Sequence, residues 1–140
     1  MRLIRRLLVL VLVGGGAWAL VNWPLINDVE TGRTPEYPDL QVKAFSASPE
    51  KVGRAAEEAI KRLPGWTLVG VGHGPGGTAI QAVHETRVFR FKDDVTVRIS
   101  REGGRTRVSV RSRSRFGKID FGQNARNIRE LLDELDRQRF

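Results

Sequence analysis

The first 26 residues of the chain are apolar apart from a cluster of arginines at the start. Arg2, Arg5 and Arg6 precede residues 7–21, which contain no charged side chain. Together with residues 22–26 the segment reaches the length of about 20 residues that a helix needs to cross a bilayer. The pattern predicts a membrane anchor over residues 1–26. Because arginines beside a spanning segment stay in the cytoplasm, we expect a single-pass protein of the bacterial inner membrane, with its N-terminus cytoplasmic and its domain outside.

A cleaved secretory signal is the alternative for the same residues. Residues 7–13 would then form its apolar core, and Ala-Trp-Ala at residues 17–19 would form a cleavage site of the small-x-small type. The apolar run continues through Leu20 and Val21, which favours the uncleaved anchor. If the segment is a cleaved signal sequence, the mature protein is secreted or periplasmic.

The next segment, residues 27–40, carries Gly32, Pro35 and Pro38 and has no hydrophobic period. Such composition is typical of irregular chain, so residues 27–40 are expected to form a tether. Residues 41–140 are then long enough for one domain with one core. A short strand over residues 41–45 is expected to open it.

A helix is predicted after this strand. Ser48 offers a side-chain oxygen to cap free amides, and Pro49 suits the first helical position. Pro64 and Gly65 end the pattern. The apolar positions between these signals recur on one helical face: Val52, Ala55, Ala56, Ala59, Ile60 and Leu63.

Four strands and a second helix follow. Residues 66–71 and 78–85 read as strands, and Gly103-Gly104 suits a two-residue hairpin turn. That turn places Ile99 opposite Val108 on an apolar face, and Arg98 opposite Ser109 on a basic face. The last helix is expected over residues 121–137 with Asp120 as its cap. The order β-α-β-β-β-β-α predicts an α+β domain, with about five antiparallel strands and two packed helices.

Several short motifs resemble a known family. They are Asn27-Asp28-Val29 with Thr31, Trp66, Thr86, Asp93-Asp94-Val95 with Arg98, and Arg111-Ser112-x-Ser114-Arg115-x-Gly117-x-x-Asp120-x-Gly122-x-Asn124 followed by Ile128. These residues resemble the bacterial family catalogued as domain of unknown function 1499, over nearly the whole segment after the anchor. The resemblance implies a bacterial protein that is often membrane-associated, and it implies no established activity, ligand or catalytic residue.

The positive charge of the chain is concentrated in one region. The formal net charge is +8, and six basic residues but no acidic ones lie between Arg105 and Lys118. The arginine fork suits carboxylate and phosphate, which makes five arginines candidates for anion binding: Arg98, Arg107, Arg111, Arg113 and Arg115. The alternative is an internal ion network, in which Arg111 and Arg115 pair with Asp93, Asp94 and Asp120.

The same aspartates raise the possibility of catalysis. Asp93, Asp94, Asp120 and His84 would supply carboxylates and a base for an envelope hydrolase, provided that they converge in a concave pocket. Each residue also has a purely structural interpretation. Asp93 and Asp94 suit a turn, Asp120 suits a helix cap, and His84 suits the core or its rim. The chain contains no cysteine and no common catalytic or phosphate-loop motif. We therefore expect no catalytic residue, no metal and no cofactor.

The partners expected from these patterns are in the envelope. Nucleic acid is not expected, because the domain lies outside the cytoplasm and its basic face has no interleaved aromatic residues for stacking bases. The sequence favours a non-catalytic, membrane-anchored bacterial envelope protein that binds anionic lipid or cell-wall material through its basic sheet face. The hydrolase is the alternative.

Overall fold

The computed structural model describes residues 24–140. The anchor expected over residues 1–26 therefore lies outside the described residues, apart from its last three positions. Within residues 24–140, no helix combines the length and the apolar character that a membrane crossing requires.

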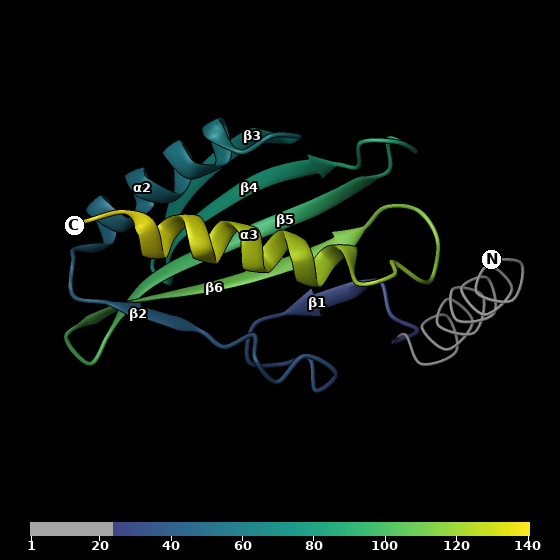
Figure 1. The fold of residues 1–140 in the computed structure, drawn as a ribbon. Coiled ribbons are helices and arrows are strands. Elements are labelled where there is room, and N and C mark those ends of the chain that lie inside the picture. Colours follow the sequence, from purple (N-terminus) through teal and green to yellow (C-terminus); the bar gives the residue numbers. More distant parts are fainter. Residues whose placement is uncertain (1–23) are drawn as a thin grey trace, which may run out of the picture.

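The domain is an antiparallel sheet of six strands with two helices packed on one face (Figure 1). In chain order the elements are β1 (Asp28–Glu30), β2 (Lys43–Phe45), α2 (Pro49–Arg62), β3 (Trp66–Gly74), β4 (Gly77–Glu85), β5 (Lys92–Glu102), β6 (Arg105–Ser114) and α3 (Gln123–Arg137). The sheet order is β1-β6-β5-β4-β3, and β2 also pairs with β6. The α+β class and the predicted order are confirmed, with one strand more than expected.

The additional strand is β1, and it corrects the prediction of an irregular tether over residues 27–40. Val29 lies fully buried in the core and pairs with Ser112, while Asp28 pairs with Arg113. A strand of three residues offers too few positions for an alternating pattern to be recognised. Its place in the sheet is set by β6, which lies about eighty residues further along the chain.

The β5–β6 hairpin has the register predicted from its turn. Ile99 pairs with Val108, Val97 with Val110, and Arg98 with Ser109. The valines and isoleucines face the helices and are buried, because alternate side chains of a strand point to opposite faces. The basic residues therefore lie on the face that the helices leave uncovered.

The two ends of the sheet differ in what they carry. The β5–β6 turn lies at one end, at the left of Figure 1. The β4–β5 loop (residues 86–91), the β6–α3 segment (residues 115–122) and the start of β1 lie together at the other. We call this second end the loop end. It is where residues 24–27 join the domain.

Candidate functional site

A cavity of about 580 Å³ lies at the loop end, between the β4–β5 loop and the β6–α3 segment. We call it the loop-end pocket. Its exposed lining is mainly apolar: Val88, Phe89, Phe91, Phe116, Ile119 and Phe121. Its less exposed lining is polar: Asp93, Ser114, Asp120 and Gln123. Thr86, Gly117 and two arginines, Arg87 and Arg126, also line the cavity. Apolar walls with a few polar groups are the usual composition of a ligand site.

Three phenylalanine rings hold the two loops of the pocket together. The rings of Phe89 and Phe91 stack at 5.5 Å between centroids, and those of Phe91 and Phe116 at 5.4 Å. Phe89 is nevertheless 74% exposed and Phe116 70% exposed. Because exposed apolar clusters are uncommon on soluble domains, such a cluster points to a binding surface.

The β4–β5 loop is closed by its own backbone. Thr86 N–H donates to the carbonyl of Phe91 at 2.8 Å, and Phe91 N–H donates to the Thr86 hydroxyl at 2.9 Å. Arg90 adopts a left-handed φ of 57° between them. These bonds fix where the loop presents Phe89 and Phe91.

Helix α3 begins two residues later than predicted, so Phe121 precedes the helix and is not part of its buried face. The carboxylate of Asp120 accepts hydrogen bonds from the backbone N–H groups of Gly122 and Asn124, both at 2.9 Å. Its side chain thus binds amides near the start of the helix, but the N-cap residue is Gly122 and not Asp120 as predicted. The chain enters the helix through residues in the left-handed region, with φ of 51° at Phe121 and 76° at Gly122. Phe121 consequently turns away from the core, is 50% exposed and lines the pocket.

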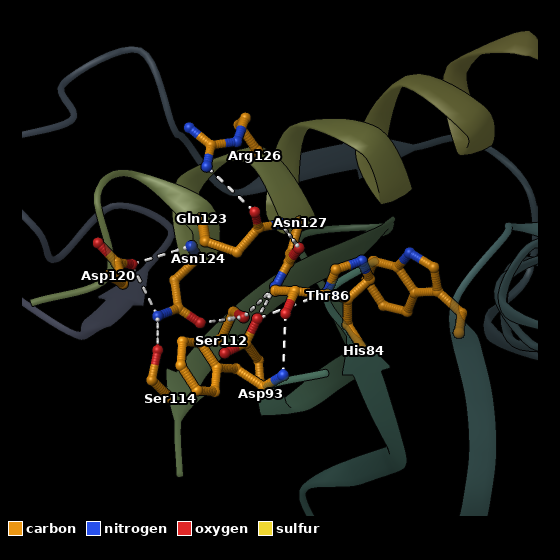
Figure 2. Close-up of polar contacts among 12 residues, drawn as sticks. His84, Thr86, Asp93, Ser112, Ser114, Asp120, Gln123, Asn124, Arg126 and Asn127 are labelled. Carbon is orange, nitrogen blue, oxygen red and sulfur yellow. Dashed lines mark hydrogen bonds and ion pairs between the residues drawn. The ribbon is translucent and has the colours of Figure 1, made fainter. Parts of the chain in front are cut away.

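Asn124 connects the helix start to the end of β6 (Figure 2), and it also binds the chain that enters β1. Its Oδ1 accepts from the Ser112 hydroxyl at 2.6 Å, and its Nδ2 donates to Ser114 Oγ at 2.7 Å and to the carbonyl of Asn27 at 3.0 Å. The side chain of Asn124 is fully buried. The long motif from Arg111 to Asn124 is thus the framework on which one wall of the pocket is built.

Asp93 lies on the inner side of the pocket and is 2% exposed. Its Oδ2 accepts from Asn127 Nδ2 at 2.8 Å and lies 3.4 Å from His84 Nδ1 (Figure 2). No residue among 24–140 donates a hydrogen bond to its Oδ1. His84 is buried as expected, and its ring packs edge-on against Trp66 at 5.6 Å between centroids.

The four residues considered for a hydrolase do not form one catalytic group. Asp93 and Asp120 line the pocket and His84 lies beside Asp93. Asp94 points to the opposite face of the sheet, where it pairs with Arg115 at 2.7 Å. The Asp120 carboxylate is occupied by the helix cap. Within the described part of the chain, no cluster of three His, Asp or Glu side chains is placed to hold a metal ion.

The arginines of the basic sheet face divide into two groups. Arg111 forms a two-point ion pair with Asp28, and Arg115 forms one with Asp94. The hydrogen bonds from Arg111 hold the pKa of the Asp28 carboxyl below its usual range. Arg107 pairs with Glu102 at 3.1 Å. Within residues 24–140, Arg98 and Arg113 make no ion pair.

These pairs correct the ion network expected from the sequence. Of its proposed links, only that between Arg115 and Asp94 forms. Asp93 and Asp120 face the helix side, and the partner of Arg111 is Asp28 in the segment expected to be a tether. A shallow hollow of about 190 Å³ remains on the basic face, lined in part by Arg98, Arg107 and Arg33.

Three phenylalanines of the pocket, Phe89, Phe91 and Phe116, were not among the residues singled out from the sequence. Phe121 was expected on the buried face of the last helix, and that prediction is wrong, because it is 50% exposed. The signal for Phe89 and Phe91 is the run Arg87-Val88-Phe89-Arg90-Phe91-Lys92, in which large apolar and basic residues mix in a connection between strands. Exposed apolar side chains in a loop do not stabilise the fold, and they become favourable only where a surface or a ligand covers them.

Comparison with known proteins gives a family and no activity. The sequence profile of the family described as protein of unknown function (DUF1499) matches residues 22–135. A search of curated proteins finds no match.

Proposed function

The chain belongs to the DUF1499 family, and we propose that this member is a non-catalytic envelope protein that its N-terminal segment attaches to the membrane. Its loop end docks on the anionic surface of the same bilayer. One observation carries the proposal: residues 24–27 join the domain beside the exposed phenylalanines. This moves the lipid contact from the basic sheet face, where the sequence pattern placed it, to the loop end.

The entering chain is fixed directly to the β6–α3 segment. The carbonyl of Ile26 accepts from Asp120 N–H at 3.0 Å, and the side chain of Asn27 donates to the carbonyl of Gly117 at 2.6 Å. The carbonyl of Asn27 accepts from Ser114 N–H at 2.9 Å. An anchor that precedes these residues therefore brings Phe116 and its neighbours to the bilayer.

The apolar residues at the loop end supply an attraction for lipid. Val88 is 81% exposed, and Phe89 and Phe116 are similarly open to water. Transfer of one such side chain to an apolar medium is worth about 1.5–3 kcal/mol. The three together contribute roughly 4–9 kcal/mol before the costs of ordering and association.

Basic side chains surround this apolar group. Residues 86–92 contain Arg87, Arg90 and Lys92 and no acidic residue, and Lys118 follows Phe116 closely in the other loop. Arg90 is paired with Glu85 at 2.6 Å, so Arg87, Lys92 and Lys118 are the charges available to lipid. Each basic residue near an anionic membrane contributes about 1 kcal/mol.

The absence of cysteine allows a direct test. Full-length Val88→Cys and Glu102→Cys variants, each labelled with an environment-sensitive fluorophore, are reconstituted into vesicles of anionic phospholipid that contain brominated acyl chains. Position 88 lies at the loop end, and the exposed control position 102 lies at the opposite end of the sheet. We expect strong quenching at position 88 and little at position 102. Equal quenching at both positions contradicts the proposed orientation.

A second candidate function is anion binding on the basic sheet face. The supporting observation is that Arg98 and Arg113 make no ion pair within residues 24–140, while Arg98 lines the hollow on that face. An Arg98→Ala, Arg107→Ala double variant should then lose binding to anionic vesicles or cell-wall polymer. Unchanged binding removes this candidate and leaves docking by the loop end intact.

A further inference from the structure

We propose that the loop-end pocket binds the headgroup of a phospholipid that carries an aminoalkyl phosphate, of the phosphoethanolamine type. The amine meets Asp93, the phosphate meets Arg87 and Arg126, and the acyl chains remain outside the pocket. The inference rests on the proposed docking and deepens it by naming the lipid.

The inner part of the pocket contains a carboxyl oxygen that can accept a hydrogen bond from a ligand. Asp93 is almost completely buried, and only its Oδ2 is engaged, by Asn127 and His84. Since Asn127 and His84 hold the carboxyl group in place, the unengaged Oδ1 is a fixed acceptor at a site that lines the cavity. Among residues 24–140 the only fully buried side-chain polar atom without a partner is Tyr37 Oη, so Asp93 Oδ1 keeps some contact with the pocket space. A ligand that enters the pocket and donates a hydrogen bond to this fixed oxygen gains affinity.

The aromatic walls of the same pocket favour a positively charged donor. Phe91 and Phe121 line the same pocket, and the face of an aromatic ring attracts an ammonium group within about 6 Å of its centroid. A carboxyl oxygen beside aromatic rings is therefore suited to an alkylammonium. A hydroxyl group can donate to Asp93 as well, but it gains nothing from the rings in this way.

Two arginines at the pocket are suited to a phosphate. The guanidinium of Arg126 donates to the carbonyl of Phe121 and to Gln123 Oε1, both at 3.0 Å and both uncharged. Arg87 makes no ion pair with any residue in the described range 24–140. Neither charge is neutralised by a carboxylate, and both side chains are exposed. Two carboxylates line the pocket, and that of Asp120 already accepts backbone hydrogen bonds. The pocket thus offers two exposed cationic groups for the phosphate and the Asp93 carboxylate for the amine, which complements the charges of a zwitterionic headgroup.

The size of the cavity limits what enters it. A volume of about 580 Å³ lies within the range of sites that hold one small ligand, which suits a headgroup better than two acyl chains. The chains would follow the exposed surfaces of Val88, Phe89 and Phe116, which the docked orientation turns to the bilayer.

The test uses full-length protein in non-ionic detergent and three lipids with identical chains. These are phosphatidylethanolamine, its N-acetylated derivative, which keeps the phosphate but lacks the positive charge, and phosphatidylglycerol. Native mass spectrometry of lipid titrations gives the dissociation constants. We expect phosphatidylethanolamine to bind about tenfold more tightly than the N-acetylated lipid, and free phosphoethanolamine to compete with it.

Two variants with a matched control locate the effect. Asp93→Asn should abolish the preference between these two lipids, while the control Asp94→Asn should keep it, because Asp94 is the next residue but faces the opposite side of the sheet. Arg126→Ala should weaken binding of all three lipids by a similar factor. Melting temperatures establish that each variant is folded. If Asp93→Asn does not fold, the test rests on two other proteins, the unaltered chain and the exposed-site variant Arg87→Ala. Their dissociation constants for the three lipids then accept or reject the proposal.

Two results would overturn the proposal: binding of the N-acetylated lipid as tight as that of phosphatidylethanolamine, or loss of the preference in Asp94→Asn as well as in Asp93→Asn. Failure here differs from failure of the docking proposal. Quenching at position 88 without headgroup preference retains docking and rejects the pocket ligand. Headgroup preference without quenching at position 88 rejects docking and retains the pocket.

Discussion

Removing the side chain of Asn124 tests whether the framework of the loop end is held by its buried polar contacts. In the Asn124→Ala variant, the Ser112 hydroxyl loses its acceptor at 2.6 Å in a fully buried position. Ser114 Oγ and Asp120 Oδ2 each lose a donor at 2.7 Å. The carbonyl of Asn27 keeps one partner, the backbone N–H of Ser114.

The expected loss of stability follows from these contacts. A buried group left without a partner costs about 1–3 kcal/mol, and each other lost hydrogen bond costs about 0.5–1.5 kcal/mol, or more when one partner is charged. For the Ser112 hydroxyl and the two other lost hydrogen bonds the sum is about 2–6 kcal/mol in the free energy of unfolding. Small domains have only about 5–15 kcal/mol in total, so the variant should be close to unfolding at physiological temperature.

Urea denaturation followed by far-ultraviolet circular dichroism measures the effect. With an m-value of about 1.5 kcal/mol/M, the midpoint should fall by about 1–4 M. Asp133→Ala is the control, because Asp133 lies exposed on the same helix and surface substitutions usually change stability by less than about 0.5 kcal/mol. A loss below about 1 kcal/mol for Asn124→Ala, with an unchanged m-value, would refute the assignment of Asn124 as the residue that holds this framework together.

Three further predictions concern other parts of the fold. Arg111→Ala should cost about 0.5–1 kcal/mol in urea unfolding, since its ion pair with Asp28 is partly exposed, whereas Arg98→Ala should cost nothing measurable; equal losses would contradict the assigned pairs. Since the pKa of Asp28 is lowered from 3.8, its stabilising contribution is present above that value and disappears as the pH falls through the lower folded-state pKa. The stability difference between the native chain and Asp28→Asn should therefore shrink in acid titrations and stay constant near neutral pH. Gly77→Ala should cost about 3–4 kcal/mol in thermal or urea unfolding, because its φ is 111° and a Cβ there would lie 2.1 Å from the carbonyl of Ile99; Gly76→Ala, which meets open space, is the control.

The sequence predicted those parts of the fold that depend on neighbouring residues. The Gly103-Gly104 turn determined the β5–β6 register because a two-residue loop leaves one way to pair the strands. Ser48 and Pro49 likewise marked the start of α2, where the Ser48 hydroxyl accepts from Lys51 N–H at 3.3 Å. In both cases the physical cause lies within a few residues.

The parts that were missed depend on residues far apart in the chain. Strand β1 forms because its backbone pairs with the edge of β6. Arg111 forms an ion pair with Asp28, which lies 83 positions away in the sequence. The later start of α3 follows from the left-handed conformation of Phe121, which pattern reasoning does not foresee in a phenylalanine. The loop-end pocket combines two connections whose proximity only the sheet order reveals.

The fixed junction at Ile26 and Asn27 determines how far the domain reaches. Extended chain spans at most about 3.3–3.6 Å per residue, and only residues 24–26 of the described chain precede Asn27, whose side chain is hydrogen-bonded into the domain. If residues 1–26 form the anchor, almost no free chain separates the anchor from the domain, so the loop end stays within about 10 Å of the lipid surface and always faces it. The opposite end of the sheet then points away from the bilayer by roughly the length of β5, which has 11 residues and spans about 36 Å. A partner of the loop end must therefore come to the membrane surface, whereas a partner of the β5–β6 turn meets the domain tens of ångströms away from it.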